Sequence, residues 1–252
     1  MSKRETWNIR EMSWTEFEER RQGTKLAIIP TGAVEVYGPH LPMGTDGLVA
    51  EGVSDLLARR TGGLVAPMMD LSDSTALMSF PGTFTISREL LQAWIEALME
   101  NLYRYGFRDF VFITGHAGSV DVINSVARRW QMEKDDLRFV QVDWWRFVGI
   151  NAETIMQERG RMANGHASEA GTSVMMHLYP DLVDFSKATC QVPPDAANFT
   201  DLHHFAPLSS RTPNGIVGNA LAGTPEKGEK IVEACLARVL SFLREQWKME
   251  IA

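Results

Sequence analysis

Cysteine is scarce in this sequence, with only Cys190 and Cys235 among 252 residues. They show no Cys-x-x-Cys spacing, so the sequence indicates neither a disulfide framework nor a thiolate metal site. Long apolar runs are also absent, and no stretch approaches the roughly 20 apolar residues that cross a bilayer. No apolar segment follows the charged start of the chain, so no secretory signal is indicated. We therefore expect a cytoplasmic protein without a membrane span.

Blocks of basic residues are missing as well, and the chain has only short pairs such as Arg20-Arg21 and Arg59-Arg60. The net charge of -7 at pH 7 opposes the phosphate backbone of nucleic acids. We expect no nucleic-acid partner and a small molecule as the substrate. A chain of 252 residues with 44% hydrophobic content can bury a sizeable core, and we expect one domain over residues 1–252.

Short apolar runs alternate with amphipathic patterns along the chain. The runs scarcely mix polar with apolar residues, which is typical of strands buried on both faces. The expected strands are 25–30, 63–69, 109–115 and 138–143, and the expected helices are 45–60, 87–106 and 119–133. Ser87, Ser119 and Gly106 supply matching start and stop signals. This alternation predicts an α/β fold with a mainly parallel central sheet covered on both faces.

Ionisable residues gather where the expected strands end. "EVYGPHLPMGTD" (35–46) follows the first strand, "GHAGS" (115–119) lies at the end of the third, and the fourth runs into Asp143. A further patch, "NGHASEAGTS" (164–173), opens a helical pattern. Because such sheets bind ligands beyond the carboxyl ends of their strands, we expect a functional site at this edge.

The chemistry of these residues suits a metal ion. Glu35 and Tyr37 are two apart and face the same side of an extended segment, and two bends can return Asp46 towards them. Two carboxylates in one pocket repel each other unless a cation or a proton lies between them. His116 and Glu169 would complete a donor set for Zn²⁺, Mn²⁺ or Fe²⁺, which acidifies bound water and polarises a carbonyl. Solvated loop acids, a structural imidazole and an N-cap role for Asp46 remain the alternatives.

These motifs resemble those of the creatininase family of metal hydrolases. The first family motif reads roughly E-x-H-G-x-H-L-P-x-x-T-D, against "EVYGPHLPMGTD" here. The motif N-G-H-x-x-N is similar to "TGHAGS", and H-A-G-E-x-E-T-S is similar to "HASEAGTS". "FPGT" (80–83) and "GIVGNALAGTPEKGEKI" (215–231) are weaker matches. The similarity runs in the same order from about Lys25 to Ile231.

The resemblance implies a three-layer α/β/α sandwich that is often assembled into homohexamers. It assigns Glu35, Asp46, His116 and Glu169 to the metal centre, with Asp46 able to bridge two ions. His166 corresponds to the histidine that family members use for proton transfer near the substrate.

Several positions depart from the family pattern. Tyr37 stands where the family usually has a histidine ligand for a second metal, and a phenol is a poor ligand. We therefore expect one tightly bound ion, Zn²⁺ before Mn²⁺ or Fe²⁺. Tyr37 is instead a candidate hydrogen-bond or proton donor to the substrate, or else a packed aromatic residue. Gly171 replaces the second glutamate of the third motif, Ser119 replaces an asparagine, and "DLSDSTALMSF" (70–80) lacks the usual glycine and histidine.

The expected function is metal-dependent hydrolysis of a small cyclic polar substrate. A cyclic keto-inositol such as 3-dehydro-scyllo-inosose is favoured, because the histidine-to-tyrosine change alters ion count and substrate together. A cyclic amide or formamide is the alternative, and an inactive binding protein is the alternative of another class. The candidate substrate-binding residues are Trp144, Trp145 and His40, with the tryptophans stacking on a ring. His203 and His204 add polar groups, although adjacent histidines in a polar stretch are also typical of a surface.

Overall fold

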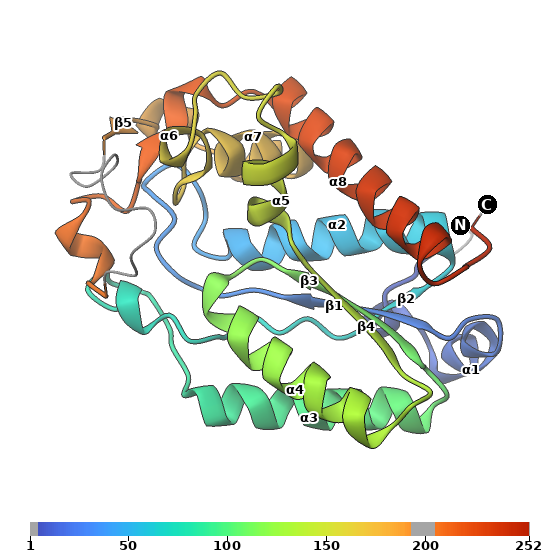
Figure 1. Ribbon diagram of the computed structural model, residues 1–252. Helices are drawn as coiled ribbons and strands as arrows, with labels where there is room; N and C mark the ends of the chain where they lie inside the picture. Colours follow the sequence, from blue (N-terminus) through green and yellow to red (C-terminus); the bar gives the residue numbers. More distant parts are fainter. Residues whose placement is uncertain (1–4, 193–204, 252) are drawn as a thin grey trace.

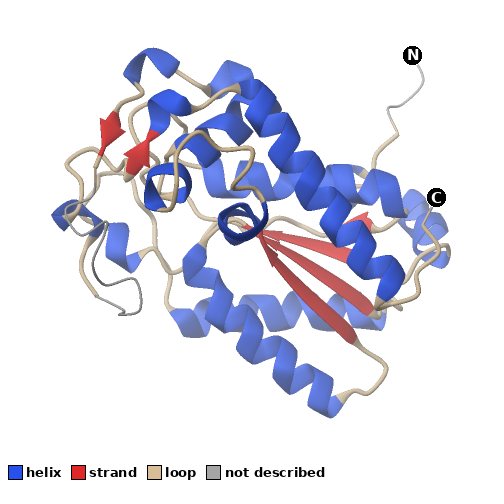
Figure 2. Cartoon of the chain, turned by 45° about the horizontal axis from the view of Figure 1, so that its top comes forward, coloured by secondary structure: helices blue, strands red, loops and turns tan. Residues whose placement is uncertain are grey.

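A four-stranded parallel sheet with the strand order β2-β1-β3-β4 forms the centre of the computed structural model, which describes residues 5–192 and 205–251. The strands are β1 (Leu26–Thr31), β2 (Leu64–Val65), β3 (Asp109–Thr114) and β4 (Arg138–Asp143). A separate antiparallel pair, β5 (Cys190–Gln191) and β6 (Gly218–Asn219), lies away from the main sheet (Figure 2).

Helices cover both faces of the sheet (Figure 1). One face carries α2, α5, α7 and α8, and the other carries α3 and α4. The helices are α1 (Trp14–Gln22), α2 (Thr45–Thr61), α3 (Arg88–Arg104), α4 (Val120–Glu133), α5 (Trp144–Asn151), α6 (Arg161–Asn164), α7 (Glu169–Leu178) and α8 (Pro225–Glu245). In the part of the chain that the structure describes, no helix combines the length and apolarity needed to cross a membrane.

Alternate residues of β1 belong to different halves of the hydrophobic core. Leu26 and Ile28 pack towards α2, α7 and α8, whereas Ala27 and Ile29 pack towards α3 and α4. Since successive side chains of a strand point to opposite faces, this division requires apolar residues at every position. The uninterrupted apolar runs therefore reflect strands buried on both faces, as the sequence predicted. The three-layer α/β/α sandwich is confirmed.

The local boundaries depart from prediction at three places. The expected strand 63–69 pairs as β2 over two residues only, with one further bridge from Thr31 to Met69. Ser87 caps α3 by accepting a hydrogen bond from the Leu90 amide, as predicted, but the Ser119 side chain makes no such cap. Asp46 is not an N-cap either, because Gly44 takes that position and Asp46 lies inside the first turn of α2.

Two glycines bring the first turn of α2 against the ends of β1 and β3. A Cβ atom on Gly32 would lie 2.3 Å from the Gly47 Cα, and one on Gly115 would lie 2.1 Å from the Asp46 carbonyl oxygen. Real Cβ atoms essentially never approach other atoms so closely. The backbone contact at Gly115 therefore fixes where Asp46 sits relative to the strand ends.

Replacing Gly115 with alanine should destabilise the protein by about 1 to 3 kcal/mol, because the added methyl group overpacks a backbone contact that cannot yield. Gly23→Ala is the matched control, since its Cβ atom would meet only the Arg20 carbonyl oxygen, at an ordinary 3.5 Å. Urea unfolding of both variants measures the difference. Equal stability of the two variants would show that the backbone around Gly115 can accommodate a methyl group.

Candidate metal centre

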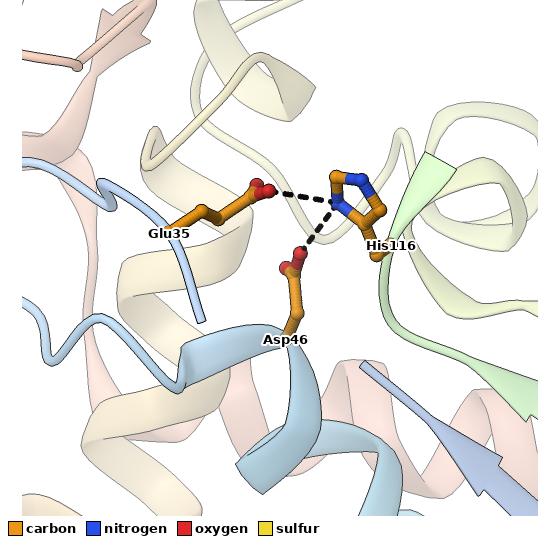
Figure 3. A group of neighbouring side chains, drawn as sticks. All are labelled: Glu35, Asp46 and His116. Atoms are coloured by element: carbon orange, nitrogen blue, oxygen red, sulfur yellow. Dashed lines mark hydrogen bonds and ion pairs between the residues drawn. The ribbon is translucent and has the colours of Figure 1, made fainter. Parts of the chain in front are cut away.

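Three buried side chains from separate segments point at one another (Figure 3). Glu35 comes from the loop after β1, Asp46 from the first turn of α2, and His116 follows β3. His116 Nδ1 lies 3.0 Å from Asp46 Oδ2 and 3.1 Å from Glu35 Oε2. One donor atom from each residue lies within 4.8 Å of the other two, which is close enough for all three to bind a single ion. The structure thus brings together three of the four predicted ligands.

The orientation of His116 decides which of its nitrogens faces the carboxylates. Its Nε2 atom lies 3.0 Å from the Asp73 carbonyl oxygen, which can only accept a hydrogen bond. Nε2 therefore carries a proton. Nδ1 faces Glu35 and Asp46, so it donates to these carboxylates while it is protonated and would offer its lone pair to an ion once that proton has left. A carbonyl that holds the outer nitrogen of an imidazole is the usual support for a metal-binding histidine.

Burial makes this arrangement unfavourable unless something positive lies within it. Burial and the charge of Glu35 raise the pKa of Asp46 to about 6. Burial also disfavours the charged form of His116, but hydrogen bonds with Asp46 and Glu35 outweigh it and raise the pKa of this imidazole. Burial opposes ionisation of Glu35 too, but hydrogen bonds with His116 and His166 prevail and lower its pKa. Either a shared proton or a cation relieves the repulsion, and two carboxylates with one imidazole suit Zn²⁺ or Mn²⁺.

His166 and Tyr37 lie beside the three ligands. His166 Nδ1 donates a hydrogen bond to the Gly215 carbonyl oxygen at 2.8 Å, and its Nε2 lies 3.3 Å from Glu35 Oε1. The Tyr37 ring packs against the His166 ring with 4.5 Å between centroids. Burial, together with the charges of Asp46 and Glu35, raises the pKa of Tyr37, so the phenol stays protonated. Both candidate catalytic residues therefore lie at the cluster.

A cavity of about 290 Å³ opens over the cluster. Among the residues that the structure describes, its polar lining consists of Glu35, Tyr37, Asp46, His116, Asn164, His166 and Arg211. Its larger apolar lining residues are Leu77, Trp145 and Leu208. A second cavity of about 390 Å³ lies between β4, α5 and α8, but none of the three clustered ligands lines it. The smaller cavity is therefore the candidate substrate site.

Glu169 does not join the three ligands, contrary to the sequence-based expectation. Its carboxylate accepts hydrogen bonds from the amides of Gln157 at 2.7 Å and Glu158 at 2.9 Å, and Lys227 Nζ lies 2.5 Å from its Oε1. Both carboxylate oxygens are thus occupied by donors. A glutamate held in this way serves the protein scaffold rather than an ion.

Two predicted substrate-binding residues are buried away from the cavity, and one lines it. Trp145 lines the cavity as predicted, whereas Trp144 is 3% exposed and packs in the hydrophobic core. His40 is also buried, with its Nε2 2.8 Å from Thr172 Oγ1, and burial lowers its pKa to about 4. His203 and His204 lie outside the described residues. The surroundings of Trp144 and His40 therefore indicate a structural role for both side chains rather than contact with a substrate.

The segment after β2 supplies supporting residues that the sequence analysis missed. Ser74 Oγ donates to Glu35 Oε2 at 2.6 Å, and the Asp73 carbonyl holds His116. Ser72 and Ser119 pair through their hydroxyl groups at 2.8 Å. These residues follow a strand end, so the rule that located the other site residues also applies to them.

Comparison with known proteins agrees with this geometry. The family model for creatininase, described as creatinine amidohydrolase, matches residues 10–243. The chain belongs to the creatininase family. It is 30% identical to the creatinine amidohydrolase of Pseudomonas putida, over 95% of this chain and 96% of that protein. It is 26% identical to the mycofactocin precursor peptide peptidase of Mycobacterium ulcerans (strain Agy99), over 84% of this chain and 83% of that protein.

Solved structures show the same relationship. A crystal structure of creatinine amidohydrolase (creatininase) superposes with a TM-score of 0.82 at 26% identity, covering 96% of this chain and 98% of that chain. A manganese form of creatininase gives the same TM-score at 27% identity, covering 96% of this chain and 99% of that chain. The chain is accordingly a metal-dependent hydrolase, and the inactive-scaffold alternative is set aside.

The raised pKa values predict how the stability of the metal-free protein depends on pH. Asp46 and His116 bind protons more tightly in the folded state. The contribution of Asp46 is lost as pH rises from about 4 to about 6, and that of His116 is lost as pH rises above the ordinary pKa of an imidazole, near 6.5. The chelated protein should therefore lose about 1 to 3 kcal/mol of stability between pH 6 and pH 8. Thermal unfolding after chelation measures this loss, and added Zn²⁺ should reverse it. Stability that stays constant or rises over this range would contradict the assignment.

Proposed function

We propose that the chain hydrolyses a small cyclic amide at a single divalent ion held by Glu35, Asp46 and His116. The observation that carries this proposal is the convergence of three buried donor atoms at the base of a cavity of about 290 Å³. Zinc and manganese forms of creatininase among the structural neighbours support Zn²⁺ first and Mn²⁺ second, with Fe²⁺ a further alternative. Homohexameric assembly, expected from the resemblance, is part of the same proposal.

Glu35, Asp46 and His116 would hold the divalent ion, which would supply an acidified water and polarisation of a substrate carbonyl. Proton movement falls to His166, because its Nδ1 is committed to the Gly215 carbonyl and only Nε2 can accept or release a proton. Nε2 lies beside Glu35 Oε1, so it can take a proton near the carboxylate and deliver it to the departing nitrogen. The protonated Tyr37 phenol lines the same cavity beside the His166 ring, so it can donate a hydrogen bond to the substrate.

The cavity lining favours an amide ring over the keto-inositol that the sequence suggested. A ring bearing hydroxyl groups all round needs polar partners on every side, because each buried hydroxyl group without a partner is costly. Among the described residues, the lining has seven polar side chains, but Leu77, Trp145 and Leu208 add apolar surface against which a hydroxyl group would find no partner. A flat ring with one polar edge at the predicted metal ligands fits these walls better. The 30% identity to a creatinine amidohydrolase also supports an amide substrate.

Peptide cleavage is the second candidate, because four of the five relatives, from three species, bear the name mycofactocin precursor peptide peptidase. The cavity of about 290 Å³ would accept only the end of a peptide.

A substrate panel of creatinine, dihydrouracil, the keto-inositol and short peptides separates the candidates. Turnover of the amide rings supports the proposal, and turnover of the peptides or keto-inositol alone would overturn it.

Asp46→Asn should remove both metal retention and turnover, because the central carboxylate loses its charge while its size is kept. Asp143→Asn is the matched control, since that aspartate ends the neighbouring strand β4 and hydrogen-bonds Gln141 outside the ligand cluster. Elemental analysis of the purified proteins should give one ion per chain for the parent and the control. Full metal content in Asp46→Asn would refute the ligand assignment.

Tyr37→His should raise the metal content above one ion per chain, because an imidazole offers a lone pair where the phenol does not. A Cβ atom on Gly171 would lie 3.3 Å from a Tyr37 ring carbon, so the tyrosine also crowds a larger side chain there. Combining Tyr37→His with Gly171→Glu should therefore raise the count further, towards two. Elemental analysis of both variants under excess Zn²⁺ measures the number of ions bound per chain. A count that stays at one in both variants would remove the idea of a lost second site.

A further inference from the structure

Glu169 and Lys227 form an ion pair at the start of α7 and α8. Glu169 is fully buried, and its Oε1 lies 2.5 Å from Lys227 Nζ, whose side chain is 18% exposed. Lys227 Nζ also donates to the Ala222 carbonyl oxygen at 2.7 Å. Removing two charges from water is costly, and a buried ion pair usually adds little to stability compared with apolar residues of similar size. Stability alone therefore gives a weak reason for this pair.

The same carboxylate holds the segment before α6. The amides of Gln157 and Glu158 both donate to Glu169, and the Glu158 side chain in turn accepts a hydrogen bond from Asn219 Nδ2 at 2.7 Å. Asn219 ends β6, which follows directly on Val217. Glu169 is thus connected to the 215–219 segment by two consecutive hydrogen bonds.

That segment fixes the position of His166. The Val217 amide donates to the His166 carbonyl oxygen, and the Gly215 carbonyl accepts from His166 Nδ1, both at 2.8 Å. The backbone just after His166 is also held in an unusual conformation, since Ala167 has a φ of 53°. A non-glycine residue keeps such a conformation only where its surroundings impose it. The placement of the His166 ring therefore depends on contacts that lead back to Glu169.

We propose that Glu169 is a positioning residue, which acts with Lys227 to hold the His166 imidazole against Glu35 and the cavity. This role rests on the proposed function, in which His166 transfers the proton. It explains why a glutamate stands three residues after His166 without facing the ligand cluster. It also differs from a ligand role in what it predicts, because loss of Glu169 should leave the ion in place and displace the histidine.

The test compares Glu169→Gln and Lys227→Met with the Zn²⁺-loaded parent protein. Two quantities are followed, the hydrogen-exchange rate of the Val217 amide by NMR and the kinetics on the amide substrate that the panel identifies. Val217 exchange should rise about tenfold or more, since the bond from this amide to His166 loosens. The kcat value should fall about 10- to 100-fold with little change in KM or Zn²⁺ content, because a displaced proton-transfer group lowers the rate of reaction.

Two further variants separate positioning from general damage. Lys227→Arg keeps the positive charge and should retain more of the parent kcat than Lys227→Met. Glu233→Gln is the matched control, because Glu233 pairs with Arg60 across α8 and α2 at the surface, with its side chain 52% exposed. This control should leave Val217 exchange and kcat unchanged.

Each outcome decides the proposal. Loss of Zn²⁺ from Glu169→Gln with unchanged Val217 exchange would return Glu169 to the ligand set and overturn positioning. A lower unfolding temperature with both readouts unchanged would leave the pair a purely structural role, which also overturns it. If no panel compound is hydrolysed by the parent, the proposed function fails, but faster Val217 exchange still supports the positioning role and unchanged exchange still refutes it. If Glu169→Gln does not fold, Lys227→Met supplies the same two readouts.

Discussion

The meeting of two buried carboxylates and one imidazole is the constraint on which the rest of the structure depends. Glu35, Asp46 and His116 come from three segments, and none of them would hold its charge or orientation alone in an apolar interior. The surrounding groups set their geometry: the Asp73 carbonyl fixes the imidazole tautomer, and the Ser74 hydroxyl donates to Glu35. The protein thus maintains an arrangement that is unfavourable without a cation and favourable with one.

The sandwich fold makes this convergence possible. Parallel strands deliver the residues that follow them to one edge, and the first turn of α2 is brought there by the close backbone contacts at Gly32 and Gly115. The "FPGT" segment contributes too, because Thr83 Oγ1 accepts a hydrogen bond from the Val36 amide next to Glu35. Apolar residues on both faces of β1 and β3 keep the strands rigid, so small displacements at the ligands are resisted.

Sequence reasoning succeeded where the pattern itself has a physical cause. Uninterrupted apolar runs gave the buried parallel strands, and motif order gave the family and the three predicted ligands that the structure brings together. Sequence reasoning failed where the contacts of a residue come from distant segments of the chain. Nothing near Glu169 indicates that Lys227 lies against it, and nothing near Trp144 distinguishes its buried position from that of Trp145 at the cavity wall. Adjacent residues of a helix point in different directions, so only the packing of α5 could assign them.

The departures from the family pattern are coupled in space rather than independent. Ser119 replaces an asparagine, and its hydroxyl pairs with Ser72 from the segment that also lacks the usual glycine and histidine. Tyr37 replaces a histidine, and its ring packs against Gly171, which replaces a glutamate. In each case the two departures lie in contact, so the side chain at one position limits what the other can hold. The hydroxyl groups of Ser72 and Ser119 are satisfied by each other, so this pair of departures leaves neither hydroxyl buried without a partner beside the three clustered side chains.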